Sequence, residues 1–435
     1  EVTAETALAV GRAVATEGNR RAVVGRDPRT TGPLLVDALS AGLRECGADV
    51  GHLGELPTPT TARAVDWYDA DIGIAVTASH NPPADNGLKL WSEDGSAVTG
   101  AEQAAIATRI EEEDYALESW DQIGKRHKFT GARGRHVDAI VDAVEVDPPL
   151  NVVVDAGHGS GRLTATALRR LGCSVTTLNG TPEGGFPARE SEPTAESCRV
   201  LCQVVAGTDA DMGIAHDGDA DRMLAVTESG EFVPGDVLLA LFARREASAG
   251  SRVAVPIDTS MIVSDVLAAV GADVARTAVG DAHVARRTEE RGVVFGGEPS
   301  GAWIWPDDTR CPDGPLAAAK LVAMVATDGS LDAVVEDVPS VPLSRRSIEC
   351  DRNDEILTRI ADAMPADDER VTTTDGIRLD VDDGWFLIRA SGTEPLIRIT
   401  AEAREAGRME ALRSAAETLV SEVMENEPPD QRTGD

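Results

Sequence analysis

Three segments of the chain repeat one pattern of apolar and polar positions. Each begins with a short apolar run, continues through a polar loop and a stretch with helical spacing of apolar residues, and ends with Gly-x-x-Val opening another apolar run. The three copies span residues 22–50, 152–175 and 253–274. Strand–helix–strand units of this length form parallel sheets with right-handed crossovers. The pattern therefore predicts three related α/β domains.

The repeat continues beyond these units into a further strand. Residues 69–75, Asp-Ala-Asp-Ile-Gly-Ile-Ala, are nearly duplicated at residues 209–215. In the third unit the matching strand is expected at residues 292–295, which lead into the loop 296–301. Each domain thus offers a loop at the end of an analogous strand, where open α/β sheets place their ligands.

The pattern changes after about residue 344. The expected elements are strands near 377–379, 385–388 and 396–401 and helices near 353–363 and from about 405. This mixture predicts a separate α+β domain. The predicted fold class is α/β, with three related α/β domains of mixed, largely parallel sheets and a C-terminal α+β domain. The predicted domains are residues 1–131, 132–248, 249–343 and 344–435.

The composition indicates a soluble protein of a reducing compartment. Hydrophobic residues make up 42% of the chain, which excludes global disorder, and no apolar run approaches the ~20 residues needed to cross a bilayer. The six cysteines are scattered, with no C-x-x-C pair and no secretory signal, so we expect a cytoplasmic location. Cys198 and Cys202 are spaced i, i+4 on an expected helix, but no His or Cys stands near them to complete a metal site. Because the chain opens at Glu1 without Met, we expect its N-terminus to be incomplete.

The charge balance restricts the classes of partner. The formal net charge is −34, and the chain has only four lysines. Nucleic acid and anionic membranes both require a basic face, so neither is expected as a partner. Acid excess with so little lysine favours a salt-rich cytosol, where screening weakens the self-repulsion, and we hypothesise a halophilic protein.

Residues 77–82, Thr-Ala-Ser-His-Asn-Pro, place a serine in a loop suited to carry a phosphoryl group. The apolar residues 72–76 lead into this loop, and Pro82 with Pro83 prevents a strand or helix from running on. Ser79 is therefore expected on a short, fixed loop at a strand end. The alternative is an ordinary turn, in which Thr, Ser and Asn are common.

A second loop, Asp217-Gly-Asp-Ala-Asp-Arg222, places three carboxylates at alternate positions. When the duplicated segments are superimposed, Asp219 falls on Ser79. Alternate residues of a turn can converge on one cation, and the all-oxygen set of Asp217, Asp219 and Asp221 suits Mg²⁺ better than zinc. An EF-hand is one alternative, but Arg222 stands where that loop requires Gly, and strands are expected on both sides. A loop of solvated acids is the other.

Two further loops carry groups suited to a phosphorylated sugar. Residues 389–395, Arg-Ala-Ser-Gly-Thr-Glu-Pro, followed by Arg398, combine guanidinium groups, hydroxyls and a glycine. Such a set fits a phosphate dianion, which accepts charge-assisted, often bidentate bonds from Arg. Residues 297–301, Gly-Glu-Pro-Ser-Gly, place a carboxylate and a hydroxyl where they can receive sugar hydroxyls, although this run alone indicates only a turn.

Together the four loops resemble those of the α-D-phosphohexomutases, the family of phosphoglucomutases, phosphomannomutases and phosphoglucosamine mutases. The loops occur in the family's order and at about its spacing, and the similarity spans essentially the whole chain. The resemblance implies four domains around one central cleft, one Mg²⁺ per chain and a phosphosugar substrate.

The resemblance also implies a role for each residue of these loops. Ser79 corresponds to the phosphoserine, whose phosphate completes the Mg²⁺ site of Asp217, Asp219 and Asp221. Arg222 is expected against that phosphate. The residues that resemble the substrate contacts are Glu298 and Ser300 for the sugar hydroxyls and Arg389, Ser391, Gly392, Thr393 and Arg398 for the non-reacting phosphate.

The implied reaction moves a phosphoryl group within a hexose phosphate. Phospho-Ser79 donates to a free sugar hydroxyl, and the resulting hexose 1,6-bisphosphate, which is also the expected activator, turns around and returns its other phosphate to Ser79. Mg²⁺ and Arg222 are expected to neutralise the transferred charge. The candidates for the base are His80 and Lys89, by their proximity in sequence. The alternative for His80 is a structural hydrogen bond within the loop.

Two departures from the family pattern bear on activity and substrate. Relatives usually begin with a Gly-Thr-Ser-Gly-type loop that contributes to the active site, and nothing matching it precedes Glu1. His often follows the last Gly of the sugar loop, whereas Ala302 follows Gly301 here. The runs Gly-Glu-Pro-Ser-Gly-Ala-Trp and Cys-Pro-Asp-Gly, the latter from Cys311, look most like archaeal members assigned as phosphoglucosamine mutases.

Glucosamine phosphate is therefore the favoured substrate. Glucose and mannose phosphates remain alternatives. So do two other functions, a metal-dependent sugar phosphatase and a catalytically silent sugar-phosphate-binding protein. The oligomeric state stays open.

Overall fold

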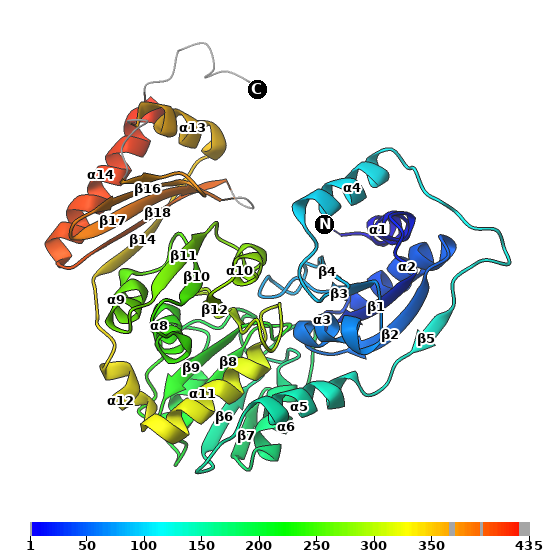
Figure 1. Ribbon diagram of the computed structural model, residues 1–435, viewed down its shortest axis with the longest axis horizontal. Helices are drawn as coiled ribbons and strands as arrows, with labels where there is room; N and C mark the ends of the chain where they lie inside the picture. The colour runs from blue at the N-terminus through cyan, green and yellow to red at the C-terminus, as the bar shows by residue number, and fades with distance from the viewer. Residues whose placement is uncertain (1, 365–369, 392–394, 426–435) are drawn as a thin grey trace.

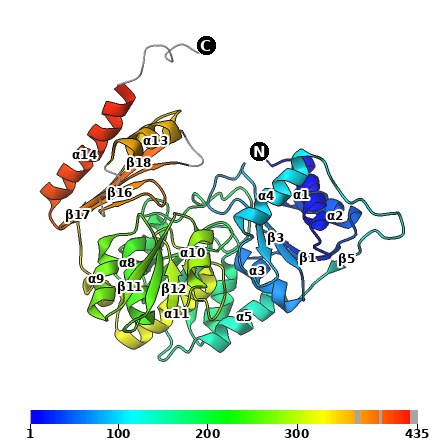
Figure 2. The same ribbon diagram turned by 45° about the horizontal axis from the view of Figure 1, so that its top comes forward.

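The computed structural model describes residues 2–364, 370–391 and 395–425 and contains four β-sheets that follow one another along the chain (Figure 1). The first sheet lies on the right of the view, the second and third lie in the middle, and the fourth lies at the upper left. A rotated view shows again that the fourth sheet is next to the third and away from the first (Figure 2). None of the helices in the described ranges is long and apolar enough to span a membrane.

The first sheet has the strand order β4-β3-β1-β2-β5, in which β4 is antiparallel to β3 and the other neighbours are parallel. Its strands are β1 (Arg21–Arg26), β2 (Asp49–Glu55), β3 (Ile72–Val76), β4 (Leu88–Ser92) and β5 (Arg126–Lys128). The helices that accompany it are α1 (Ala4–Thr16), α2 (Gly32–Glu45), α3 (Thr58–Trp67) and α4 (Gly100–Glu111). A capping box begins α4, because the Thr99 hydroxyl accepts from the Glu102 N–H while the Glu102 carboxylate accepts from the Thr99 N–H.

The second and third sheets repeat the order of the first. They read β7-β6-β8-β9 and β11-β10-β12-β13, each with one antiparallel edge strand. The strands are β6 (Asn151–Asp155), β7 (Ser174–Leu178), β8 (Met212–His216), β9 (Met223–Thr227), β10 (Arg252–Pro256), β11 (Asp273–Thr277), β12 (Val293–Gly297) and β13 (Trp303–Ile304). The helices are α5 (Ala132–Ala143), α6 (Arg162–Arg170), α7 (Arg199–Ala206), α8 (Gly235–Glu246), α9 (Met261–Ala269), α10 (Asp281–Thr288), α11 (Gly314–Asp328) and α12 (Leu331–Glu336). The shared order confirms the predicted α/β repeat.

Burial explains why the strands that lead into the site read as continuous apolar runs. Every residue of β3 and of β8 is buried, as expected for parallel strands covered on both faces. The second and third domains share one apolar core, in which the ring centroids of Phe242 and Trp303 lie 5.2 Å apart. The first and fourth domains have apolar clusters of their own.

The fourth sheet is antiparallel throughout, in the order β14-β18-β17-β16-β15. Its elements are β14 (Leu343–Glu349), α13 (Asn353–Ala363), β15 (Val371–Thr372), β16 (Ile377–Val381), β17 (Gly384–Ala390), β18 (Leu396–Ala403) and α14 (Ala406–Glu425). This is the predicted α+β domain. Glu402 attaches it to the third domain by accepting from the Met261 N–H at 2.7 Å. The predicted domain boundaries stay predictions, and the last residues of the fourth domain, 426–435, lie outside the described residues.

Candidate active site

Ser79 lies on the loop between β3 and β4, with 7% of its surface exposed. Its φ is 49°, in the left-handed region that serine rarely adopts. Its N–H donates to Thr77 Oγ1 at 2.9 Å, and its hydroxyl donates to Asp217 Oδ2 at 2.6 Å. A residue held in a sparsely populated conformation at a strand end is typical of functional sites. This geometry favours the functional interpretation of Ser79 over an ordinary turn.

A buried ion pair that the sequence analysis missed holds this loop in place. Asp27 and Arg29 are both fully buried, and Arg29 Nε donates to Asp27 Oδ2 at 2.9 Å. The terminal nitrogens of Arg29 donate to backbone carbonyl oxygens of Ser79, Asn81, Pro82 and Asp85. Burial raises the pKa of Asp27 to about 6, although Arg29 acts to lower it. The only signal in the sequence is the run Asp-Pro-Arg directly after β1.

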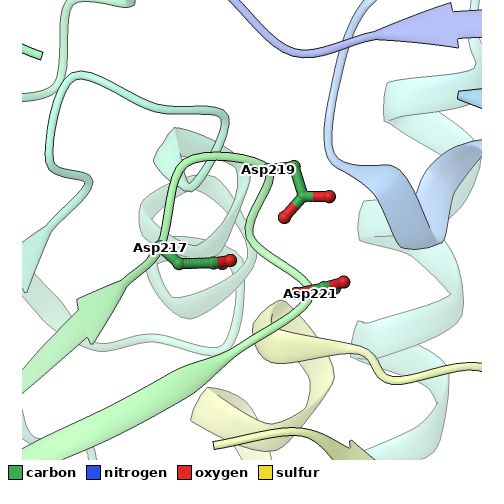
Figure 3. Close-up of side chains that lie close together, drawn as sticks. All are labelled: Asp217, Asp219 and Asp221. Carbon is green, nitrogen blue, oxygen red and sulfur yellow. The ribbon is translucent and has the colours of Figure 1, made fainter. Parts of the chain in front are cut away.

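Three aspartates lie on the loop between β8 and β9, and their carboxylates point to the same side (Figure 3). One oxygen from each of Asp217, Asp219 and Asp221 lies within 4.8 Å of the others, and all three residues are buried. Within the described residues this is the one such cluster of His, Cys, Asp or Glu, so Cys198 and Cys202 form none. Asp219 Oδ1 is buried with no hydrogen-bond partner in the described chain. An orphaned carboxylate oxygen beside two others fits a hard divalent cation such as Mg²⁺.

We call residues 77–87, between β3 and β4, the serine loop and residues 217–222, between β8 and β9, the metal loop. The backbone of the metal loop brings it against the serine loop. Ala220 has a φ of 58°, and Gly218 lies so close to the neighbouring loop that a Cβ there would be 2.6 Å from the Ser79 carbonyl oxygen. The EF-hand alternative is excluded, because β9 follows the loop directly and Glu228 accepts instead from the Asp332 N–H at 3.0 Å.

The three carboxylates repel one another in this buried loop. Burial, followed by the charges of Asp221 and Asp219, raises the pKa of Asp217 well above its usual value. Burial and the charge of Asp219 raise the pKa of Asp221 to about 6. A divalent cation relieves this repulsion, since it compensates two of the charges at once.

The first domain supplies groups that hold the metal loop from across the domain boundary. Thr58 begins α3, and its N–H and Oγ1 donate to the Asp219 carbonyl oxygen at 2.9 Å and to Asp219 Oδ2 at 2.7 Å. Lys89 Nζ lies 3.2 Å from Asp219 Oδ2 and forms a second, shorter ion pair with Asp221. Burial acts to lower the pKa of Lys89, but these carboxylates outweigh it and raise the pKa well above its usual value. Thr58 was not predicted, because nothing near it in the sequence carries a site motif.

His80 and Arg222 flank the contact between the two loops. Burial, followed by the charges of Arg222 and Lys89, lowers the pKa of His80 to about 4, and its Nδ1 is buried with no hydrogen-bond partner within the described ranges. The Arg222 N–H donates to Asp217 Oδ1 at 3.2 Å, and its guanidinium lies 3.6 Å from a Glu192 carboxylate oxygen. The alternative for His80, a structural hydrogen bond within the loop, is therefore not made by Nδ1 to any described residue.

The predicted sugar loop follows β12 and is joined to the metal loop. Glu298 is buried, Ser300 Oγ donates to its Oε2 at 3.1 Å, and the Gly280 N–H donates to its Oε1 at 2.8 Å. The Met223 N–H donates to the Gly301 carbonyl oxygen at 2.9 Å. Burial, followed by the charge of Asp281, raises the pKa of Glu298 to about 7.

The predicted phosphate loop lies between β17 and β18. Arg389 and Arg398 stand opposite each other on these strands, so both side chains project from the same face of the sheet. Arg389 Nε donates to Asp375 Oδ2 at 2.8 Å, and the same oxygen accepts from the Val279 N–H of the third domain at 2.8 Å. Ser391 is buried, and its N–H donates to the Leu396 carbonyl oxygen at 2.9 Å. Gly392 and Thr393 lie outside the described residues.

The structure therefore brings the predicted residues together, some by direct contact and others through intervening residues. Ser79, the three aspartates and Lys89 touch one another directly. The sugar loop reaches this group through a backbone bridge between Arg222 and Ala302, and the phosphate loop reaches the sugar loop through residues 279 and 280. The four predicted loops are thus connected one to the next, from the loop of Ser79 through the aspartate loop and residues 297–301 to the loop after β17.

Comparisons with known proteins match this arrangement along the chain. Models of the phosphoglucomutase/phosphomannomutase alpha/beta/alpha domains I, II and III and of its C-terminal domain match residues 1–117, 134–230, 234–341 and 347–419. A probable phosphoglucosamine mutase of Methanococcoides burtonii is 42% identical over 98% of this chain and 96% of its own. One from Methanopyrus kandleri is 42% identical over 98% of this chain and 95% of its own.

A solved structure shows the same fold. A phosphoglucomutase/phosphomannomutase family protein of Burkholderia thailandensis superimposes with a TM-score of 0.89 at 28% identity, covering 98% of this chain and 95% of that one. Sequence identity, coverage and fold agree, and this chain belongs to the phosphoglucomutase/phosphomannomutase family.

Proposed function

We propose that this protein is a Mg²⁺-dependent phosphohexomutase that interconverts glucosamine 6-phosphate and glucosamine 1-phosphate. The proposal rests on the 2.6 Å hydrogen bond from Ser79 Oγ to Asp217 Oδ2, which joins a strained serine of one domain to a buried carboxylate cluster of the next. The names of the two archaeal relatives support glucosamine phosphate as the substrate. Glucose and mannose phosphates are the competing substrates.

Ser79 is proposed as both phosphoryl donor and acceptor. In the first half-reaction the P–Oγ bond of phospho-Ser79 breaks, a P–O bond forms to a free sugar hydroxyl, and the hydroxyl proton leaves to a base. In the second, the Ser79 oxygen attacks the other phosphate of the hexose 1,6-bisphosphate, and the proton returns to the sugar oxygen that is released. A trace of the same bisphosphate would restore phospho-Ser79, which is why it is the expected activator.

The charge that develops during transfer needs fixed positive groups. Asp217, Asp219 and Asp221 would hold one Mg²⁺, which supplies positive charge beside the transferred phosphoryl group. Arg222 and Lys89 add two cations from the protein. Lys89 pairs with Asp219 and Asp221, and the Arg222 guanidinium belongs to the residue directly after Asp221 and lies 3.6 Å from a Glu192 carboxylate oxygen.

His80 is proposed as the base. It follows Ser79 directly, and its Nδ1 is buried with no hydrogen-bond partner in the part of the chain that is described. Lys89 Nζ is engaged by Asp219 and Asp221 instead, which suits charge neutralisation.

Two loops would bind the rest of the substrate. Glu298 and Ser300 are proposed to contact the sugar hydroxyls. The residues proposed for the non-reacting phosphate are Arg389, Ser391 and Arg398, together with Gly392 and Thr393.

The test is a panel of glucosamine, glucose and mannose 6-phosphates, each incubated with Mg²⁺, high KCl and a trace of glucose 1,6-bisphosphate and followed by ³¹P NMR. We expect the 1-phosphate to form from glucosamine 6-phosphate without inorganic phosphate, and S79A to form none. Steady release of inorganic phosphate would identify the phosphatase instead. No 1-phosphate from any of the three sugars would contradict the proposal.

A further inference from the structure

Three acidic residues stand at the same end of the third sheet. The adjacent parallel strands β11, β10 and β12 are followed by segments that carry Asp281, the first residue of α10, Asp258 and Glu298 respectively. Glu298 accepts from the Gly280 N–H at 2.8 Å, so the segments after β11 and β12, the two neighbours of β10, are joined to each other. Asp258 follows the middle one of these three strands, and its charge interacts with those of Glu298 and Arg389.

Asp258 has a counterpart in the first domain, and the two differ in their partners. In the repeat, residues 22–25 match residues 253–256, so Asp27 and Asp258 both stand two residues further on. Asp27 is satisfied by Arg29 and by the Thr77 hydroxyl. The residue two positions after Asp258 is Ser260 instead of arginine, and Asp258 Oδ1 is buried with no hydrogen-bond partner among the described residues.

Two cations, Arg345 and Arg389, act on the charge of Asp258, and each is already paired with another carboxylate. Arg345 lies 3.0 Å from Asp236, and Arg389 lies 2.8 Å from Asp375. The charge of Asp258 adds to that of Asp281 in raising the pKa of Glu298, so the three acids share one electrostatic environment. A buried carboxylate oxygen without a partner is costly, and a charged donor compensates it better than a neutral one.

We infer that Asp258 receives the ammonium group of an amino sugar phosphate and so selects it over sugars that carry a hydroxyl at the same carbon. The inference rests on the proposed function, since Glu298 and Ser300 would bring the sugar to this point. A hydroxyl can donate one hydrogen bond to Asp258 but brings no positive charge of its own. An ammonium group donates the bond and neutralises the carboxylate, which makes Asp258 a specificity-determining residue for this reaction.

The test compares kcat/KM for glucosamine 6-phosphate and glucose 6-phosphate in the wild type, D258N and D273N. In D258N the preference for the amino sugar should fall by roughly 10- to 100-fold, the effect of a hydrogen bond to a charged group. Turnover of glucose 6-phosphate should persist, because asparagine still accepts a bond from a hydroxyl. D273N is the matched control, since Asp273 is an exposed aspartate at the opposite end of β11, and it should keep the wild-type preference.

The binding of both sugars to S79A and to S79A/D258N, measured by calorimetry, gives a second readout without turnover. Loss of affinity for glucosamine 6-phosphate alone supports the inference. An unchanged preference in D258N, or an equal loss for both sugars, overturns it and leaves the proposed mutase intact. Absence of 1-phosphate from every sugar in the wild type would instead contradict the proposed function.

Discussion

The serine loop and the metal loop are two versions of one strand-end loop. Both follow a fully buried parallel strand, β3 or β8, and both return into an antiparallel edge strand, β4 or β9. Each contains a non-glycine residue in the left-handed region, Ser79 with a φ of 49° and Ala220 with a φ of 58°. The first loop presents a hydroxyl and the second presents three carboxylates.

The two loops differ in what holds them. Arg29, from the same domain, fixes the serine loop through four carbonyl oxygens. In the metal loop, the side chains of Asp219 and Asp221 are held by Thr58 and Lys89, which belong to the other domain. The serine loop therefore takes most of its support from its own domain, with one further bond from Ser191 Oγ of the second domain to the Ser79 carbonyl oxygen at 3.0 Å. The Asp219 side chain of the metal loop takes its partners only from the first domain, among the described residues. The repeated fold provides the position of each loop, and contacts outside the repeat decide its chemistry.

Breaking the metal loop should have the largest effect. D219N replaces one carboxylate oxygen by an amide nitrogen and removes the charge of Asp219, so mutase activity should fall by about 10³-fold. Addition of Mg²⁺ should raise the Tm of the wild type and leave that of D219N unchanged, because a ligand stabilises only the state that binds it. The control is D273N, and a Mg²⁺-dependent rise in the Tm of D219N would contradict the assignment of this ligand.

Breaking the support of the serine loop should have the next largest effect. R29M leaves Asp27 buried without its cation, so the free energy of unfolding, measured in urea, should fall by about 3 kcal/mol. The double variant D27N/R29M should recover part of that stability, because the uncompensated charge is gone. Its rate of Ser79 phosphorylation should stay low, since the carbonyl oxygens of the loop remain unsupported. Full recovery of both properties would show that Arg29 acts only through Asp27.

A smaller effect is expected from loosening the metal loop across the domain boundary. T58V removes the hydroxyl that donates to Asp219 but keeps the N–H, and the affinity for Mg²⁺ should fall by about 10- to 100-fold. T58S, which keeps the hydroxyl, should bind Mg²⁺ like the wild type. Equal affinities in T58V and the wild type would show that the metal loop does not depend on the first domain through this bond.

The smallest effect concerns the docking of the domains and depends on pH. Buried His136 on α5 hydrogen-bonds Thr60 of α3 at 2.8 Å and Asp313 at 2.9 Å, and Arg63 also pairs with Asp313. Burial lowers the pKa of His136, and Asp313 offsets only part of this. The unfolded chain therefore binds more protons, so this contribution to stability is complete above the unfolded pKa of His, about 6.5, and is lost as the pH falls below it.

The H136Q variant tests that contribution. Between pH 7.5 and pH 5.5 the wild type should lose more free energy of unfolding than H136Q, as measured by urea denaturation at both pH values. An equal loss in the two proteins would show that His136 does not link the docked domains to pH.

The periodicity of apolar residues in the sequence predicts most of the fold. The strand expected at residues 292–295 is β12 at Val293–Gly297, and the helix expected near 353–363 is α13 at Asn353–Ala363. A buried strand appears as a run of neighbouring apolar residues, and a helix as apolar residues at helical spacing. Both patterns can be read from a short stretch of sequence, so the repeat and the α+β domain were predictable. The residues with recognisable chemistry, above all Ser79 and the three aspartates, were predicted because each motif is contiguous.

The supporting residues could not be predicted in the same way. The role of Arg29 depends on its bonds to carbonyl oxygens about fifty residues away in the chain. The role of Thr58 depends on its bond to a carboxylate in another domain. Neither partner leaves a pattern around the residue itself. For Asp258 the sequence shows Ser260 where its counterpart Asp27 has Arg29, but only the folded chain reveals that Asp258 Oδ1 is buried with no partner among the described residues.

The most direct test of the central claim is whether Ser79 itself takes the phosphoryl group. Wild-type protein and S79A are incubated with glucose 1,6-bisphosphate and Mg²⁺, and their intact masses and peptide maps are compared. The account predicts that the wild type gains the mass of one phosphoryl group, located at Ser79, and that S79A gains none. A phosphoryl group on another residue, or an S79A variant that still forms the 1-phosphate, would contradict it.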